Sequence, residues 1–180
     1  MIFYYSGCGN SRFIAESLAK DLSETLIFIP DAEREGRYEY TLSQGEAVGF
    51  VFPIYSWRPP HLVSEFVSKL KFKGISPYVW AVFTCGDNVG MSEKVFRDEL
   101  NEVGLRLDAT YCFVMPNTYV NMSAMKIDSK RVAERKLSKS KQQLPYVAGA
   151  IKERQAVSEV KKGLFPRFKT NVVFFINLLA

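Results

Sequence analysis

Residues 47–52, Ala-Val-Gly-Phe-Val-Phe, contain no polar side chain, and this run limits how the chain can fold more than any other feature. Successive residues of a β-strand point to opposite faces of the sheet, so a strand that is apolar throughout needs cover on both faces. Such strands lie at the centre of parallel sheets that have helices on each side. The run ends sharply at Pro53, and it predicts a core strand of an α/β fold.

Strand-like and helix-like segments alternate along the chain, which indicates a mainly parallel sheet. We expect strands over residues 2–5, 25–29, 47–52, 78–84 and 107–115, and helices over residues 11–22, 60–70 and 91–103. The charged stretch 127–153 predicts either one helix kinked at Pro145 or two consecutive helices. Residues 31–46 predict a surface excursion with at most a short helix. Together these segments predict a doubly wound, three-layer α/β/α sandwich with a five-stranded parallel sheet.

The chain has 180 residues, 47% of them hydrophobic, which is enough for one domain with a substantial core. We predict a domain over residues 1–155 and a C-terminal tail over residues 156–180, which joins basic residues to an apolar end and is expected to be helical. There is no secretory signal and no run near the roughly 18 apolar residues of a membrane span, so the expected location is the cytoplasm. The three cysteines are widely spaced and predict neither a disulfide framework nor a metal site.

A loop of small residues lies between the first predicted strand and the first helix. Backbone N–H groups at the start of a helix have no partner within it, and with the helix dipole they favour an anion. Gly7 and Gly9 let the backbone approach a ligand closely. Arg12 stands where a dinucleotide motif needs its third glycine, and the Gly-Lys-Ser or Gly-Lys-Thr of a Walker loop is absent. We predict a mononucleotide phosphate site, or a turn that binds nothing, at Ser6, Gly7, Cys8, Gly9, Asn10 and Ser11.

Two further loops follow predicted strands, and ligands of doubly wound sheets bind at the carboxyl ends of the strands. One loop offers the flat apolar surfaces of Tyr55 and Trp57, and the other offers glycine backbone with polar groups of Asp87 and Asn88. Trp57 is the favoured stacking residue, whereas Tyr55 either stacks or packs under its loop. Asp87 and Asn88 either bond the ligand or form an ordinary turn. The predicted residues of these loops are Pro53, Ile54, Tyr55, Ser56, Trp57, Thr84, Cys85, Gly86, Asp87, Asn88 and Gly90.

Four of these strand ends resemble those of flavodoxin-like proteins, most of all the flavodoxin half of bacterial flavodoxin–ferredoxin fusion proteins. The similar segments, residues 3–11, 52–55, 84–88 and 115–117, are spread over nearly the whole chain. The resemblance implies flavin mononucleotide (FMN), with the first loop on its phosphate, the next two loops flanking its ring, and Asn117 and Tyr119 on the outer side of the ring. The family usually has threonine where Cys8 stands, and a thiol is a weaker hydrogen-bonding group. No cysteine follows Cys112, so this sequence lacks the cluster ligands of the ferredoxin part.

The net charge of +5 sets this chain apart from acidic electron carriers and favours acidic partners, anionic lipid or polyanions. Basic residues concentrate in residues 126–169 without a nucleic-acid motif, so a nucleic-acid partner is not expected. For the tail, three alternatives stay open: packing on its own domain, docking on a partner or second subunit, and lying on an anionic membrane surface.

The leading functional hypothesis is an FMN-binding electron-transfer protein whose flavin carries the chemistry, so that no catalytic side chain is required. Its partner is a redox protein or a small-molecule electron acceptor. The second hypothesis is an FMN-dependent NAD(P)H:quinone oxidoreductase, which needs open space above the ring. The third is an interaction module that keeps the fold but binds no flavin.

Overall fold

The apolar run predicted as a core strand forms β4 (Ala47–Pro53), in which every residue after Ala47 is buried. It pairs in parallel with β1 (Ile2–Tyr4) on one side and with β6 (Tyr78–Cys85) on the other. This computed structural model of the protein describes residues 1–74, 76–118 and 127–173. The central position of β4 confirms what its apolar pattern predicts.

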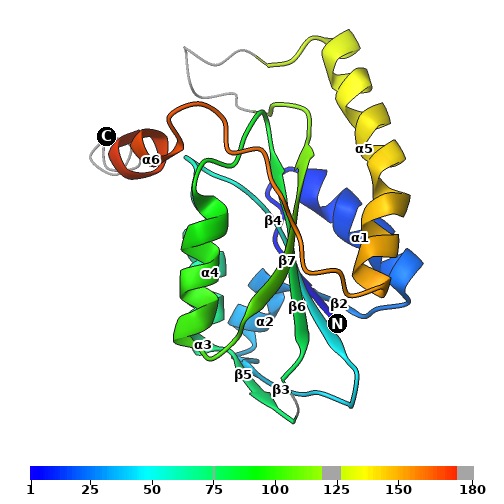
Figure 1. The fold of residues 1–180 in the computed structure, drawn as a ribbon, viewed down its shortest axis with the longest axis vertical. Helices are drawn as coiled ribbons and strands as arrows, with labels where there is room; N and C mark the ends of the chain where they lie inside the picture. The colour runs from blue at the N-terminus through cyan, green and yellow to red at the C-terminus, as the bar shows by residue number, and fades with distance from the viewer. Residues whose placement is uncertain (75, 119–126, 174–180) are drawn as a thin grey trace.

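Six parallel strands form the main sheet, in the order β2-β1-β4-β6-β7-β8. The remaining three are β2 (Leu26–Phe28), β7 (Leu107–Val114) and β8 (Ser158–Glu159). Figure 1 labels β2, β4, β6 and β7 of this sheet. The direction of winding reverses at β1, because β2 lies on one side of it and β4 on the other. Such a reversal opens a crevice at the carboxyl ends of the strands, where doubly wound proteins bind ligands. The loops after β1 and β4 therefore meet where a ligand site is expected.

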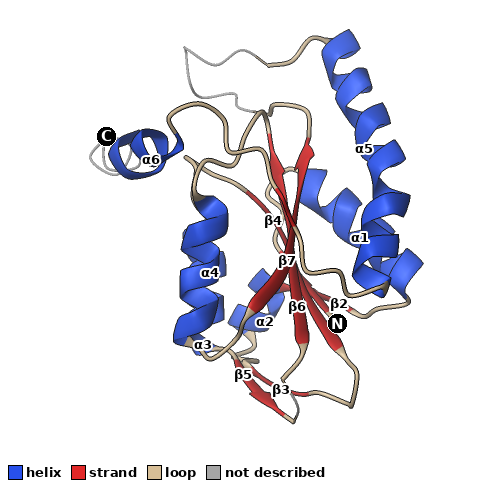
Figure 2. Cartoon of the chain, in the orientation of Figure 1, coloured by secondary structure: helices blue, strands red, loops and turns tan. Residues whose placement is uncertain are grey.

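Helices cover both faces of the main sheet and complete the predicted three layers (Figure 2). One face carries α1 (Asn10–Leu22) and α5 (Lys130–Lys152), and the other carries α2 (Ile29–Arg34), α3 (His61–Lys69) and α4 (Ser92–Glu102). A second sheet pairs β3 (Glu39–Thr41) with β5 (Lys71–Lys73). After β8 the chain forms a short helix, α6 (Pro166–Phe168), and a π-helical turn, η1 (Lys169–Val173). No helix in the described part of the chain has the length and apolarity needed to cross a bilayer.

The predicted number of five strands is wrong, because β8 adds a sixth at the edge of the sheet. Ser158 and Glu159 pair with Thr110 and Tyr111 of β7, and the Thr110 N–H donates to the Val157 carbonyl at 2.9 Å. Both residues of β8 are exposed, so its sequence lacks the apolar pattern that marks the other strands. Main-chain hydrogen bonds to an open edge create this strand. The division into a domain over residues 1–155 and a tail over residues 156–180 stays a prediction.

Two other segments differ from the expected pattern in detail. Residues 31–46, predicted as a surface excursion with at most a short helix, contain most of α2 and the strand β3. Pro30 lies in the first turn of α2, where a residue without an N–H loses no hydrogen bond. Pro145 lies inside α5, which continues past it as one helix, so the alternative of two consecutive helices is wrong.

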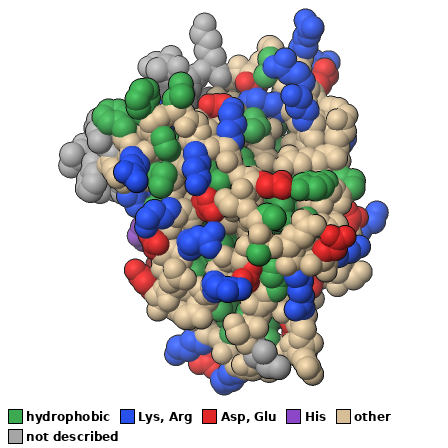
Figure 3. Space-filling model, in the orientation of Figure 1, with side chains coloured by type: hydrophobic (Ala, Val, Ile, Leu, Met, Phe, Trp, Pro, Cys, Tyr) green, Lys and Arg blue, Asp and Glu red, His purple; other side chains and the backbone are tan. Residues whose placement is uncertain are grey.

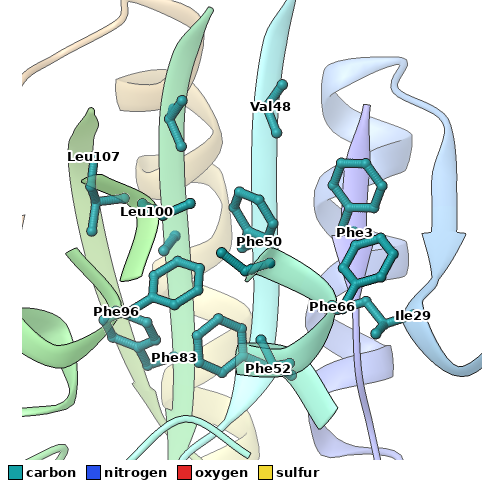
Figure 4. Packing of buried hydrophobic residues seen from close by; sticks show 14 of the residues in the cluster. Phe3, Ile29, Val48, Phe50, Phe52, Phe66, Phe83, Phe96, Leu100 and Leu107 are labelled. Carbon is teal, nitrogen blue, oxygen red and sulfur yellow. The ribbon is translucent and has the colours of Figure 1, made fainter. Parts of the chain in front are cut away.

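Large side chains hold the strands rigidly on both faces of the sheet. On the face of α3 and α4, Phe96 contacts the rings of Phe50 and Phe52, with centroid separations of 5.3 and 4.8 Å (Figure 4). On the opposite face, the Trp80 ring lies so close to Gly49 that a Cβ at Gly49 would be 2.2 Å from it. Close packing of this kind resists displacement. The strand ends are thus fixed supports for the loops that follow them.

Candidate functional site

The loop between β1 and α1 presents backbone donors at the start of a helix. Gly9 precedes the first helical residue in the left-handed conformation, with a φ of 94°, and its N–H donates to the Ser6 hydroxyl at 3.1 Å. Phe13 is the first residue of α1 whose N–H donates to a backbone carbonyl, that of Gly9, at 2.9 Å. The N–H groups of residues 10–12 have no acceptor among the residues that the structure describes. With the helix dipole, they favour an anion at this point.

Two polar side chains of this loop bond neighbouring strand ends. Ser11 Oγ and Thr84 Oγ1 share a buried hydrogen bond of 2.7 Å. Asn10 Nδ2 donates to the Pro116 carbonyl at 3.0 Å. Both contacts fix the start of α1 against the sheet. The predicted contact of these residues with a phosphate stays a prediction, and the backbone N–H groups and Ser6 are the donors that it depends on most.

A cavity of about 340 Å³, which we call the smaller cavity, lies beside this loop. A Cβ on Gly7 would be only 2.8 Å from the Tyr55 hydroxyl. The absence of a side chain at Gly7 therefore lets the loop after β1 and the loop after β4 approach each other. Cys8 Sγ lies 3.1 Å from Thr118 Oγ1 at the exposed side. No described residue in the wall carries a charge. The wall contains the predicted residues Ser6, Gly7, Cys8, Asn10, Ser11, Pro53, Ile54, Tyr55, Thr84, Cys85, Gly86 and Asn117.

The loop after β4 turns back on itself at Ser56 and Trp57. The N–H of Tyr55 donates to the Arg58 carbonyl at 3.0 Å, and the N–H of Arg58 donates to the Tyr55 carbonyl at 2.9 Å. Ser56 and Trp57 have φ angles of 48° and 59°, in the left-handed region that favours glycine. Each non-glycine residue held there costs about 1–3 kcal/mol. The turn therefore stores strain, and contacts elsewhere must hold it.

Trp57 is held by the loop that follows β6. Its Nε1–H donates to Asn88 Oδ1 at 2.9 Å, and Asn88 Nδ2 donates to Asp87 Oδ2 at 2.8 Å. Gly90, with a φ of 57°, lies beneath the indole, because a Cβ there would be 2.8 Å from Trp57 Cδ1. The two loops predicted to flank a ring thus touch each other directly. The indole N–H is already engaged, and Lys169 Nζ lies over the ring at 5.6 Å from its centre. A ligand that stacks on Trp57 would therefore meet this cation or use the other face of the ring.

The segment after β8 packs on its own domain, one of the three alternatives left open for the tail, but the sequence did not predict that it would return to these loops. The Val89 N–H donates to the Lys161 carbonyl at 2.9 Å, and the Met91 N–H donates to Thr170 Oγ1 at 2.9 Å. Arg58 Nε donates to the Thr170 carbonyl at 3.2 Å. The only sequence signal for this return was the concentration of basic residues before residue 170. This part of the predicted tail therefore belongs to the wall of the site.

A second cavity, of about 830 Å³, lies between α5 and the returning segment, and we call it the larger cavity. It shares Ile54, Cys85, Gly86 and Asn117 with the smaller cavity, so the two are adjacent. Of the predicted residues, Ser56, Trp57, Asp87 and Asn88 line only the larger one. Its basic side chains, none of which was predicted, are Arg135, Lys136, Lys139, Lys161 and Lys169. Tyr119, implied by the resemblance, lies outside the described residues.

Two carboxylates in the larger cavity are paired with lysines. Lys136 Nζ donates to Asp128 Oδ2 at 2.7 Å and to the Gly86 carbonyl at 2.8 Å. Burial would raise the pKa of Asp128, but hydrogen bonds from Lys136 and from the Asn117 N–H outweigh it and lower that pKa. The hydrogen bond from Lys161 lowers the pKa of Asp87. Both carboxylates are therefore charged near neutral pH.

Two cysteines, Cys85 and Cys112, lie side by side in the wall of the larger cavity. Their Sγ atoms are 3.4 Å apart and both residues are buried. The hydrogen bond between them raises the pKa of the Cys85 thiol and lowers that of Cys112. Together with Val114 they form an apolar part of the wall. No three His, Cys, Asp or Glu side chains gather as metal ligands in residues 1–74, 76–118 and 127–173.

Comparisons with known proteins identify the fold around these cavities. A family model described as "Flavodoxin domain" matches residues 1–156. No curated protein matches the chain. An azoreductase from Bacillus anthracis str. Sterne superposes with a TM-score of 0.52 at 10% identity, covering 82% of this chain and 97% of that chain. A WrbA-like flavodoxin from Agrobacterium tumefaciens has a TM-score of 0.46 at 15% identity, covering 86% of this chain and 97% of that chain.

Proposed function

The chain belongs to the flavodoxin domain family, and from this premise we propose that it binds FMN at the carboxyl ends of β1, β4 and β6 and uses the flavin to carry electrons. The observation that supports this most directly is the start of α1. There the N–H groups of residues 10–12 have no acceptor within the described residues, and the uncharged smaller cavity lies beside them. Such donors bind a phosphate without the help of a charged side chain.

The shape of the first loop fits a phosphate group. Gly7 has a near neighbour in the Tyr55 hydroxyl, and Gly9 has a φ of 94°, so a side chain at either position would disturb the loop. A ligand can therefore approach the backbone itself. The Ser6 hydroxyl, which accepts from the Gly9 N–H, can donate its own proton to a phosphate oxygen. These groups make a cradle of neutral donors for a dianion.

For the ring of the flavin, we propose Trp57 as the flat surface on one side and the backbone of residues 86–88 as the hydrogen-bonding edge. Trp57 is already fixed by Asn88 and Gly90, which lowers the entropy lost when a ring stacks on it. When bound, FMN supplies the one- and two-electron chemistry. The residues of this chain then hold the phosphate, cover the ring and exclude water, so no acid or base is required of them.

A second candidate function is an FMN-dependent NAD(P)H:quinone oxidoreductase. The observation in its favour is the larger cavity, which adjoins the smaller one and has a volume of about 830 Å³. Space of this size beside a flavin suits a second small molecule. In both candidates the electrons leave to a redox protein or a small-molecule acceptor. Oxidation of NADH or NADPH in the presence of a quinone, measured in the steady state, distinguishes an enzyme from a simple carrier.

The first test is the visible spectrum of the purified protein, followed by titration of the apoprotein with FMN and with riboflavin. We expect FMN to bind much more tightly, because riboflavin lacks the phosphate that the first loop would hold. Equal affinities would contradict the phosphate site. If neither flavin binds, the proposal fails and the flavin-free interaction module becomes the better hypothesis.

A further inference from the structure

The larger cavity carries an excess of positive charge. Lys136 and Lys161 are each paired with a carboxylate, Asp128 and Asp87. The other three basic side chains, Arg135, Lys139 and Lys169, have no carboxylate within 4.0 Å among the described residues. With five basic and two acidic side chains, the described lining has a net charge of +3, and Arg135 and Lys169 act on Asp128 and Asp87 only through longer-range charge interactions. A bound anion would reduce the repulsion among the basic groups.

These charges come from two sides of the cavity. Arg135 and Lys139 are four residues apart on α5 and therefore share one face of that helix. Lys169 comes from the returning C-terminal segment, and its Nζ lies 5.6 Å from the centre of the Trp57 ring. In Figure 3, Lys and Arg side chains gather near the start of α5 and near the C-terminal segment. A ligand between them would be held from both sides.

The rest of the wall contains an apolar part beside polar side chains and the carboxylates of Asp87 and Asp128. Cys85, Cys112 and Val114 lie at the ends of β6 and β7, and Trp57 closes the side next to the loop after β4. An inorganic anion would leave this surface without contact. A ligand with a flat apolar body and acidic groups at its edges would satisfy both parts of the wall.

We propose that the larger cavity binds a small planar organic anion with two acidic groups, and that this anion is the electron acceptor of the protein. The binding part stands on the cavity alone, whereas the electron transfer rests on the proposed function. Because Trp57 and residues 86–88, which we propose to hold the flavin ring, also line the larger cavity, an anion held by Arg135, Lys139 and Lys169 in that cavity would lie beside the ring. If the acceptor is a quinone, two electrons and two protons from reduced FMN convert its carbonyl groups to hydroxyl groups, and the FMN returns to its oxidised form.

Calorimetric titration with anthraquinone-2,6-disulfonate, a planar dianion, tests the binding directly. Menadione serves as the neutral comparison, and added salt should weaken only the binding of the dianion. In the double variant Arg135→Gln, Lys139→Gln we expect the affinity for the disulfonate to fall about tenfold, with no comparable change for menadione. The matched control is Lys20→Gln, Lys152→Gln, which removes two exposed charges at the far ends of α1 and α5 that form no ion pair with any described residue.

The outcomes separate this proposal from the proposed function. Disulfonate binding that is lost only in the Arg135 and Lys139 variant supports the anion site, even if FMN does not bind. FMN binding without disulfonate binding overturns the anion site and leaves the flavin proposal intact. An equal loss of disulfonate affinity in both double variants would mean that only the overall charge of the protein matters, and this result also overturns the anion site. Binding of an acidic carrier protein with no binding of the disulfonate would assign these charges to a protein surface instead.

Discussion

The two cavities at the carboxyl ends of the strands are built in opposite ways. Among the described residues, the wall of the smaller one carries no charge, and it depends on backbone N–H groups and small residues of the loops that follow the strands. The larger one is lined by basic side chains from α5 and from the returning C-terminal segment. The smaller cavity is suited to recognise a ligand through the geometry of its backbone N–H groups, and the larger cavity through the charge of its side chains. Substitutions should therefore affect the two in distinguishable ways.

The largest effect is expected from Gly9→Val in the first loop. A β-branched residue is strained at a φ of 94°, so the loop must rearrange and misplace its N–H groups. FMN affinity should fall about 100-fold, or about 2.7 kcal/mol, and riboflavin affinity much less. Fluorescence titration measures both. Gly36→Val is the matched control, because Gly36 has a φ of 65° and, like Gly9, no atom within 4 Å of an added Cβ. An equal loss in both variants would contradict the role of the loop.

A smaller effect, with a different pattern, is expected from Trp57→Ala. The indole would contact the ring and not the phosphate, so FMN and riboflavin should both lose affinity about tenfold. Trp57→Phe keeps a flat face but loses the hydrogen bond to Asn88, and it should recover most of the affinity. If Trp57→Ala lowers the affinity for FMN but not for riboflavin, Trp57 acts through the phosphate loop, and its assigned role as a stacking surface for the ring is wrong.

Lys136→Met should reduce stability by about 1 kcal/mol at pH 7, because it leaves the half-buried Asp128 without its cation. The pKa of Asp128 is lowered in the folded protein, so the stabilisation is present above the ordinary value of 3.8 and is lost as the pH falls through the folded pKa. The difference between wild type and variant should therefore shrink below about pH 3.8. Urea unfolding at several pH values measures it. A difference that does not change with pH would assign the effect to packing.

The smallest effect is expected from Lys161→Gln, which removes the partner of Asp87. These two side chains are 57% and 71% exposed, and exposed ion pairs contribute at most about 1 kcal/mol. Thermal unfolding should show a change smaller than that of Lys136→Met. The Val89 N–H still has the Lys161 carbonyl as its acceptor in the variant, so the segment should stay in place. A larger loss would show that the charge itself holds the segment.

The smaller cavity could be predicted because its walls coincide with local patterns. The apolar run of β4 located the centre of the sheet, and the small residues between β1 and α1 marked the loop beside it. What could not be predicted were the partners of individual atoms. The hydroxyl of Ser11, a predicted residue of the phosphate site, bonds Thr84, a residue 73 positions away. Contacts of that range depend on how the strands pack and leave no trace in the local sequence.

The larger cavity could not be predicted either, because it depends on how whole helices and segments pack against the sheet. Lys136 reaches the Gly86 carbonyl because α5 packs beside α1 on one face of the sheet. In the sequence it is one basic residue in a charged helix. Likewise, β8 is made by hydrogen bonds to an open strand edge, and its two exposed residues give no pattern of their own.

The turn at Ser56 and Trp57 places stability and ligand binding in opposition. Glycine or asparagine at position 56 would relieve the strain of a left-handed residue, so selection for thermostability alone should favour those changes. The relaxed turn would then depend less on Asn88 and Thr170 to hold its shape, and the indole would sample more orientations. A library of variants screened for melting temperature should therefore be enriched in chains that fold better and bind a flavin ring less well.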